Sequence, residues 1–223
     1  MAILGFYDDL TARLKAAGDY VWPTALRLIM FWEFWEAGIK KYHGDNWFAN
    51  IPWADWQKGF PWPFSAINQD LNWFLATWGE LVFAFLILFG LFTRFAALSL
   101  IVITAVATAA VHWPAQWDGL GALWEGYVIT AKDAGNYKLP LLFLLLLMPL
   151  LFHGGGKLSL DHLLLKITGR TDQIPNQTGD LQAAGMALAV LGIAAIWLEP
   201  SWGIPLLLAG GLAIAVPMLK RSN

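Results

Sequence analysis

Long apolar stretches alternate with polar connections along the chain, and their lengths match membrane-spanning helices. Between residues 74 and 113 only Glu80 and Arg94 carry a charge, and the stretch is about twice as long as one helix crossing the hydrocarbon layer. A break at 90–94 therefore predicts two spans joined by a tight turn. The whole pattern predicts six spans, at 21–41, 74–90, 94–113, 139–153, 181–198 and 203–219.

The segments outside these spans have compositions typical of a membrane surface. Residues 1–18 place apolar side chains at helical spacing and lack the continuous apolar run of a cleavable signal peptide, so they predict an amphipathic helix on the surface. The Trp- and Pro-rich connection at 43–73 is expected at the interface. Residues 157–170 predict a second surface helix.

Near the C-terminus, the polar stretch 171–180 is typical of a linker and precedes a transmembrane hairpin at 181–220. Small residues lie four apart on both arms of this hairpin, namely Gly185 with Ala189 and Gly211 with Ala215. Such spacing predicts close packing between helices.

The composition agrees with a membrane protein. Hydrophobic residues make up 58% of the 223 residues and charged residues 13%, whereas soluble domains carry about 25% charge. The net charge of −2 gives no support to nucleic-acid binding. Because the chain has no cysteine, it can form no disulfide, thiol relay, Fe–S cluster or Cys-ligated zinc site by itself.

Lysine and arginine are expected to gather on the cytoplasmic side of a membrane. With both termini cytoplasmic, the inner segments would hold Arg13, Lys15, Arg94, Lys157, Lys166, Arg170, Lys220 and Arg221, and the outer segments Lys40, Lys41, Lys58, Lys132 and Lys138. We therefore predict a multi-pass membrane protein with both termini in the cytoplasm.

Ionisable residues within the spans are the first candidates for function, because charges in a bilayer are costly. Glu33, Glu36 and Lys40 share a stripe of about 60° on the first span. Glu80 on the second span is expected at a similar depth, with Lys40 or Lys41 as its counter-ion. These residues predict a polar pocket in the outer half of the bundle, although buried Glu–Lys pairs can also simply hold helices together.

Other residues extend the candidate set. Glu33, Lys41, Arg94 and Trp78 are candidate contacts for a cofactor. His43 and His112 fall at the outer boundary and are weaker candidates for binding a metal. Arg94 and Asp161 are expected at the inner boundary, where they could form a pair.

Three segments carry a resemblance to the DoxX family. The first runs from Ala25 to Lys41, with Arg27 near its start and Gly-x-x-Lys near its end. The second runs from Glu80 to Ala97 and includes the turn Gly90-Leu91-Phe92-Thr93-Arg94. The third is Gly155-Gly156-Lys157-Leu158-Ser159-Leu160-Asp161. Each is weak alone, but their order and spacing resemble that family over residues 20–170.

The resemblance implies an all-α membrane protein with a four-helix core at 20–170, to which this chain adds the C-terminal hairpin. Some DoxX-like proteins are membrane subunits of thiosulfate:quinone oxidoreductase, and others accompany redox-defence proteins. The long Trp-rich outer loops are most similar to the HvfX-like branch, whose members accompany peptide-modifying iron enzymes linked to copper-binding peptides.

These observations leave three hypotheses for the function. In the first, the chain is the membrane subunit of a quinone-linked oxidoreductase; Glu36 and Glu80 accept protons, and Lys40 or Lys41 holds an anionic state. In the second, it is a non-catalytic accessory or assembly subunit that docks other protein subunits. In the third, His43 and His112 handle copper or another metal.

Overall fold

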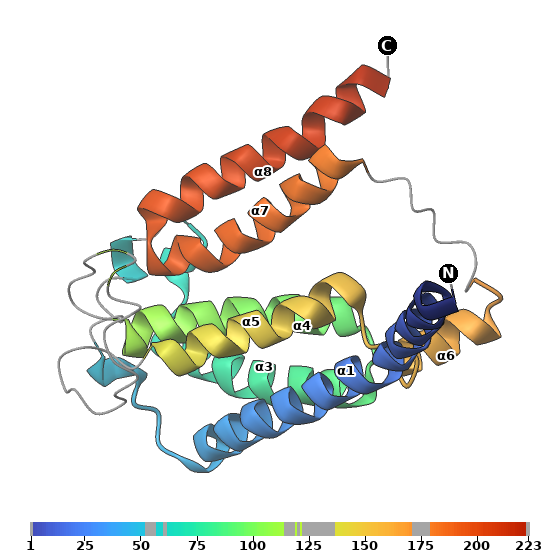
Figure 1. Ribbon diagram of the computed structural model, residues 1–223. Coiled ribbons are helices and arrows are strands. Elements are labelled where there is room, and N and C mark those ends of the chain that lie inside the picture. Colours follow the sequence, from blue (N-terminus) through green and yellow to red (C-terminus); the bar gives the residue numbers. More distant parts are fainter. Residues whose placement is uncertain are drawn as a thin grey trace. The chain divides into compact units, whose positions relative to one another are not determined.

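The computed structural model describes residues 2–51, 57–59, 62–113, 119, 121, 137–170 and 179–221, and these contain helices and no strands (Figure 1). The helices are α1 (Ala2–His43), α3 (Gln69–Phe89), α4 (Thr93–Ala107), α5 (Lys138–His153), α6 (Leu160–Ile167), α7 (Asp180–Leu198) and α8 (Pro200–Arg221). Short helical turns lie at η1 (Phe48–Asn50), η2 (Gln57–Gly59) and η3 (Phe64–Ala66), and the π-helical turn η4 (Thr108–His112) extends α4.

Four helices in the described part of the chain are long and apolar enough to cross a membrane: α3, the run Thr93–His112, α7 and α8. The predicted fourth span is the shorter apolar helix α5. The predicted first span lies within α1, which continues from the predicted surface helix without a break and is about 63 Å long at 1.5 Å per residue. These helices confirm the prediction of an all-α membrane protein.

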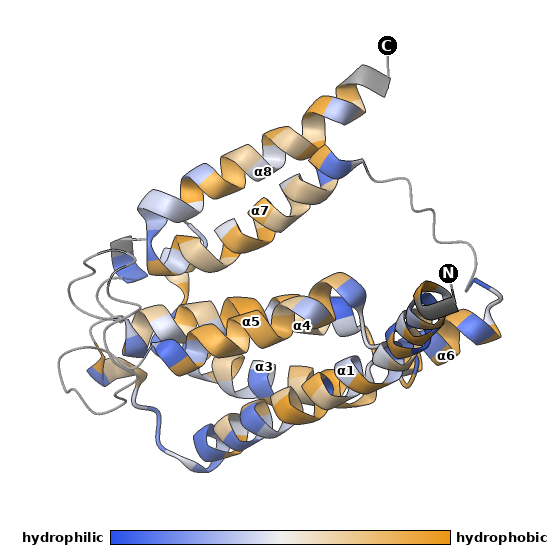
Figure 2. Ribbon diagram, in the orientation of Figure 1, coloured by the Kyte–Doolittle hydropathy of each residue, from blue (hydrophilic) through white to orange (hydrophobic). Residues whose placement is uncertain are grey.

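Helix α3 buries two polar residues and exposes many apolar ones. Its buried residues include Thr77 and Glu80. After its polar first turn, which exposes Gln69 and Asp70, its exposed residues are apolar: Leu71, Phe74, Leu75, Trp78, Val82, Phe85 and Phe89. Figure 2 shows that α4, α5, α7 and α8 are apolar along most of their length, and each of them has at least one large apolar side chain that is exposed. A helix in water would expose its polar face, so this arrangement is that of a bundle in lipid.

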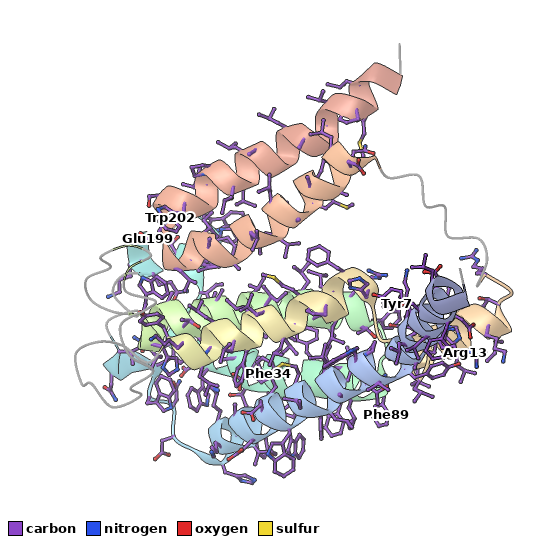
Figure 3. All side chains as sticks on the ribbon, in the orientation of Figure 1. Tyr7, Arg13, Phe34, Phe89, Glu199 and Trp202 are labelled. Carbon is purple, nitrogen blue, oxygen red and sulfur yellow. The ribbon has the colours of Figure 1, made fainter. Side chains whose placement is uncertain are left out.

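The chain divides into two compact units. The first comprises residues 1–46, 70–100 and 145–174, and its core includes Met30, Phe34, Ile87, Leu100 and Leu147. Phe34 is buried, whereas Phe89 projects outward (Figure 3). All of the polar contacts that concern function below lie within this unit.

The second unit comprises residues 47–69, 101–144 and 175–223, and α7 packs against α8 within it. The predicted close packing is present at Gly185, and on α8 the glycine that faces α7 is Gly210 and not Gly211. A Cβ on Gly185 or Gly210 would meet the facing helix within 3.0 Å, whereas a Cβ on Gly211 would meet nothing within 4 Å. Because each residue turns a helix by about 100°, Gly210 faces α7 and its neighbour does not.

Candidate functional site

Helices α1 and α3 are joined by a buried ion pair between Lys41 and Glu80. The Lys41 Nζ donates to both carboxylate oxygens of Glu80, at 2.7 and 2.9 Å. Only 19% of the Lys41 side chain and 6% of the Glu80 side chain are exposed. Lys41 is thus the counter-ion of Glu80, one of the two lysines that the sequence offered for this role.

Lys40, the residue before Lys41, forms a different ion pair. Lys40 Nζ donates to Glu36 at 2.6 Å, one turn earlier on the same helix, and both side chains are largely exposed. Lys41 lies about 140° around the helix from Glu36, so only Lys41 faces α3. The structure therefore leaves Glu36 and Lys40 outside the buried pair, and Glu33 is half-buried on the same helix.

An aromatic groove of about 270 Å³ also runs between α1 and α3. It is lined by Trp35, Ile39, Tyr42, Trp78, Leu81, Val82 and Phe85. Trp78 lies about 160° around α3 from Glu80, so it faces this groove and not the ion pair. Between groove and pair, Gly38 fits against Leu81, leaving no space for a side chain at position 38.

Beside Glu80, one further polar group is buried. The hydroxyl of Thr77 lies one turn before Glu80 on the same buried face of α3 and has no hydrogen-bond partner among the described residues. Sequence reasoning missed this threonine, although the i, i+3 spacing to Glu80 would have placed both on one face. An unpaired buried hydroxyl is unfavourable unless a ligand or water satisfies it.

The candidate metal residues are not gathered into a cluster. The described residues contain no group of three or more His, Asp or Glu side chains that could hold a metal ion. His43 is exposed at the end of α1, with its ring edge against Tyr42. His112 ends the π-helical turn η4 in the second unit.

The turn between α3 and α4 forms a second polar site with the segment that leads into α6. Gly90, with φ +62°, ends α3 in a Schellman motif, in which Leu91 N donates to Leu86 O and Gly90 N to Ile87 O. The Asp161 carboxylate then caps α4 by accepting bonds from Phe92 N and Thr93 N at 2.7 and 2.8 Å.

Two arginines connect the remaining helices to this junction. The guanidinium of Arg27, buried in α1, donates to Leu158 O at 2.8 Å. Arg94 donates to the carbonyls of Leu151 and Phe152 at the end of α5. Arg94 and Asp161 both lie at this junction, but the possible pair between them is not formed, because backbone groups at helix ends occupy both side chains.

The junction brings together the three segments that carry the family resemblance. Arg27 comes from the first, Gly90 and Arg94 from the second, and Ser159 and Asp161 from the third. Between Glu80 and the end of α3 at Phe89 there are about 14 Å of helix rise, so Arg94 belongs to this junction and not to the Lys41–Glu80 pair. The signature positions thus divide between two sites.

The apolar exposed faces and the buried charged pair define a multi-pass α-helical membrane protein. Comparison with known proteins agrees: the DoxX family model matches residues 22–113. A protein of Haemophilus influenzae described as uncharacterized is 41% identical over 155 residues, covering 70% of this chain and 91% of that protein. The chain belongs to the DoxX family.

No solved structure matches the chain significantly. Neither match separates the HvfX-like branch from the rest of the family, so that assignment stays a prediction.

Proposed function

We propose that the chain is the membrane subunit of a quinone-linked oxidoreductase, and that Lys41 and Glu80 handle protons and charge at its quinone site. The observation that carries the proposal is the ion pair itself, buried between two helices of a lipid-facing bundle. Charges in this position are costly, and carboxylates within membrane proteins commonly serve in proton relays. We place the protein in a bacterial inner membrane, with both termini in the cytoplasm.

The pair has neighbouring groups that a quinone could use. The unpartnered hydroxyl of Thr77 can donate to a carbonyl oxygen, one turn from the Glu80 carboxylate. A bound quinone would accept two electrons from the partner subunits and two protons. Glu80 would hold a proton at its carboxyl group, and the more exposed Lys41 would return one to it from the aqueous boundary.

A second function is favoured by the geometry of the same pair. Lys41 already contacts both oxygens of Glu80, so the two charges are satisfied without any ligand. Such a pair could serve only to join α1 and α3 in an accessory or assembly subunit. The two functions differ in what a neutral replacement of the pair does: it stops proton transfer in the first and only loosens the helices in the second.

The test replaces both members of the pair, because removing one would leave an unpaired buried charge. The variant Lys41→Gln/Glu80→Gln keeps hydrogen-bonding groups at both positions, and Lys40→Gln/Glu36→Gln is the matched control on the exposed pair. Each is measured for abundance of the complex in native membranes, quinone reduction per complex, and binding of a short-tailed ubiquinone analogue to the purified chain.

For the quinone function we expect the buried-pair variant to lose about a hundredfold in turnover per complex, the lower range for general acid–base groups, and to bind the analogue more weakly. The control should match the wild type. Normal turnover per complex together with reduced abundance would instead establish the accessory function. Normal turnover with normal abundance would exclude any role of this pair.

A further inference from the structure

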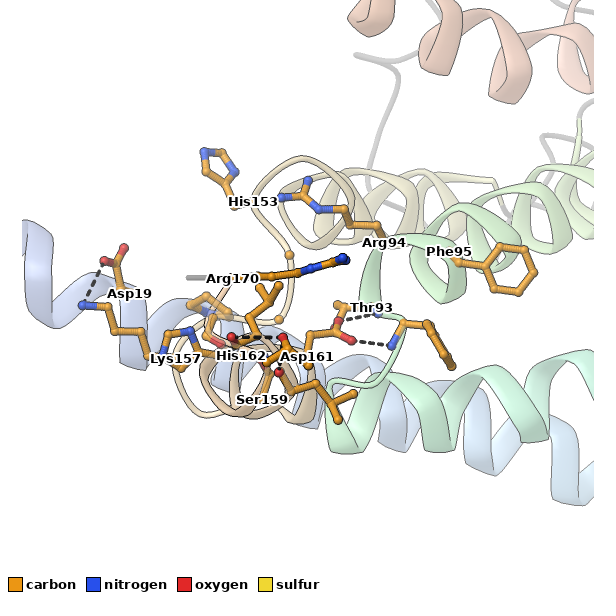
Figure 4. Close-up of a pocket in the computed structure, with 18 residues that line it drawn as sticks. Asp19, Thr93, Arg94, Phe95, His153, Lys157, Ser159, Asp161, His162 and Arg170 are labelled. Atoms are coloured by element: carbon orange, nitrogen blue, oxygen red, sulfur yellow. Dashed lines mark hydrogen bonds and ion pairs between the residues drawn. The ribbon is translucent and has the colours of Figure 1, made fainter. Parts of the chain in front are cut away.

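A cavity of about 730 Å³ opens at the junction of α1, the α3–α4 turn and the segment around α6. Its charged lining residues are Asp19, Arg94, Lys157, Asp161 and Arg170, and two histidines also line it (Figure 4). The cations outnumber the carboxylates. Because the apolar helices α3 and Thr93–His112 meet at this turn, the cavity lies at a membrane boundary.

Both carboxylates of the cavity are already engaged. Asp161 accepts two backbone hydrogen bonds from the start of α4. Asp19 lies 3.9 Å from the ammonium group of Lys157. Both carboxylates thus have partners within the protein, and the lining holds three cations for two carboxylates.

The arginines are the cations that remain available. Arg94 uses one guanidinium nitrogen for the carbonyls at the end of α5, and its other nitrogens have no partner among the described residues. The Arg170 guanidinium likewise has none there, and it extends across the cavity toward Thr93 and Arg94 (Figure 4). Planar guanidinium groups bind phosphate oxygens particularly well.

Arg170 is held by the fold. Gly169, with φ +66°, ends α6 in a second Schellman motif, in which Arg170 N donates to Leu165 O and Gly169 N to Lys166 O. The backbone of Arg170 is therefore fixed at the rim of the cavity. Lys166, near the end of α6, is exposed but does not line the cavity.

A buried hydroxyl also points to a ligand. Thr93 lines the cavity, is fully buried, and its Oγ1 has no hydrogen-bond partner among the described residues. An acceptor bound in the cavity would satisfy it.

We propose that this cavity binds the phosphate headgroup of an anionic phospholipid. Arg94 and Arg170 bind the phosphate, and Thr93 donates to one of its oxygens. The apolar side chains of Leu164 and Leu165 line the same cavity and would accompany the acyl chains, which favours a lipid over free phosphate. Basic pockets at membrane boundaries bind anionic headgroups in this way.

The test is calorimetric titration of the full-length protein, in an uncharged detergent, with dioctanoyl phosphatidylglycerol, dioctanoyl phosphatidylcholine or inorganic phosphate. We expect phosphatidylglycerol to bind more tightly than the other two. Arg170→Gln should weaken it about fivefold, the effect of one cation near a membrane surface. The control Lys166→Gln should bind like the wild type.

A second variant does not change charge. Thr93→Val removes the unpaired hydroxyl and keeps the shape, so it should weaken phosphatidylglycerol binding without lowering the melting temperature of the lipid-free protein. Equal affinity for the two lipids, or equal effects of Arg170→Gln and Lys166→Gln, would overturn the proposal. Phosphate binding as tight as that of phosphatidylglycerol and dependent on Arg170 would show a free-anion site and overturn the lipid.

Discussion

Lys40 and Lys41 are consecutive residues of α1, and each binds a glutamate, yet their surroundings are opposite. The Lys40–Glu36 pair lies on one exposed helix face, with 72% and 48% of the two side chains accessible. The Lys41–Glu80 pair joins two helices and is almost enclosed. The two Lys–Glu ion pairs are therefore expected to contribute differently to stability. Water or headgroups can solvate the first pair, whereas the charges of the second depend on their own hydrogen bonds.

The largest effect is expected from breaking the buried pair on one side. Glu80→Leu would leave the Lys41 ammonium without its partner, and losing one member of a buried pair costs about 3–5 kcal/mol. Unfolding of the purified protein in detergent measures this loss. The matched variant Glu36→Leu should cost far less, and equal losses from the two substitutions would show that burial does not distinguish the pairs.

A smaller effect is expected where α1 and α3 touch beside the pair. A Cβ on Gly38 would lie 2.8 Å from two side-chain atoms of Leu81 and 3.3 Å from its backbone nitrogen. Gly38→Ala should therefore separate the helices and cost about 1–3 kcal/mol, the range for overpacking.

Gly211→Ala is the control for that substitution, since a Cβ at this helical position meets nothing within 4 Å. It should be neutral or stabilising, because alanine favours the helix over glycine. If Gly38→Ala were equally harmless, α1 and α3 would not be in close contact at the pair.

The smallest effect is expected on the exposed pair. Lys40→Met should cost less than about 1 kcal/mol, as is usual for surface ion pairs. Added salt should reduce even this difference, since ions screen exposed charges. The measurement is unfolding of the wild type and the variant at low and high salt. A loss as large as that of Glu80→Leu would contradict the account.

Sequence reasoning located the α3–α4 turn because charge, glycine and span length agree at residues 90–94. It failed where the answer depends on which side of a helix a residue faces. A depth estimate cannot tell Lys40 from Lys41, or Gly210 from Gly211, because neighbours differ by about 100° in direction and little in height.

The contacts at the junction could not be predicted from the sequence for a different reason. Arg94 and Asp161 were recognised as charges at one boundary, but opposite charge suggested a pair, whereas both side chains bind backbone groups at helix ends. Arg170 was predicted only as one of the inner cations, since its position over the cavity depends on how α6 ends. Thr77 and Thr93 have no charge and were passed over, although both hydroxyls are buried without a partner in the described part of the chain.

The most direct test of the difference between the buried Lys41–Glu80 pair and the exposed Lys40–Glu36 pair is a double-mutant cycle for each, measured by unfolding in detergent. Each cycle gives the coupling energy of its pair. For Lys41→Met and Glu80→Leu we predict a coupling of about 3 kcal/mol, since each single variant leaves a buried charge and the double variant leaves none. For Lys40→Met and Glu36→Leu we predict about 0.5 kcal/mol or less. Two equal couplings below about 1 kcal/mol would contradict the existence of a buried, energetically distinct ion pair.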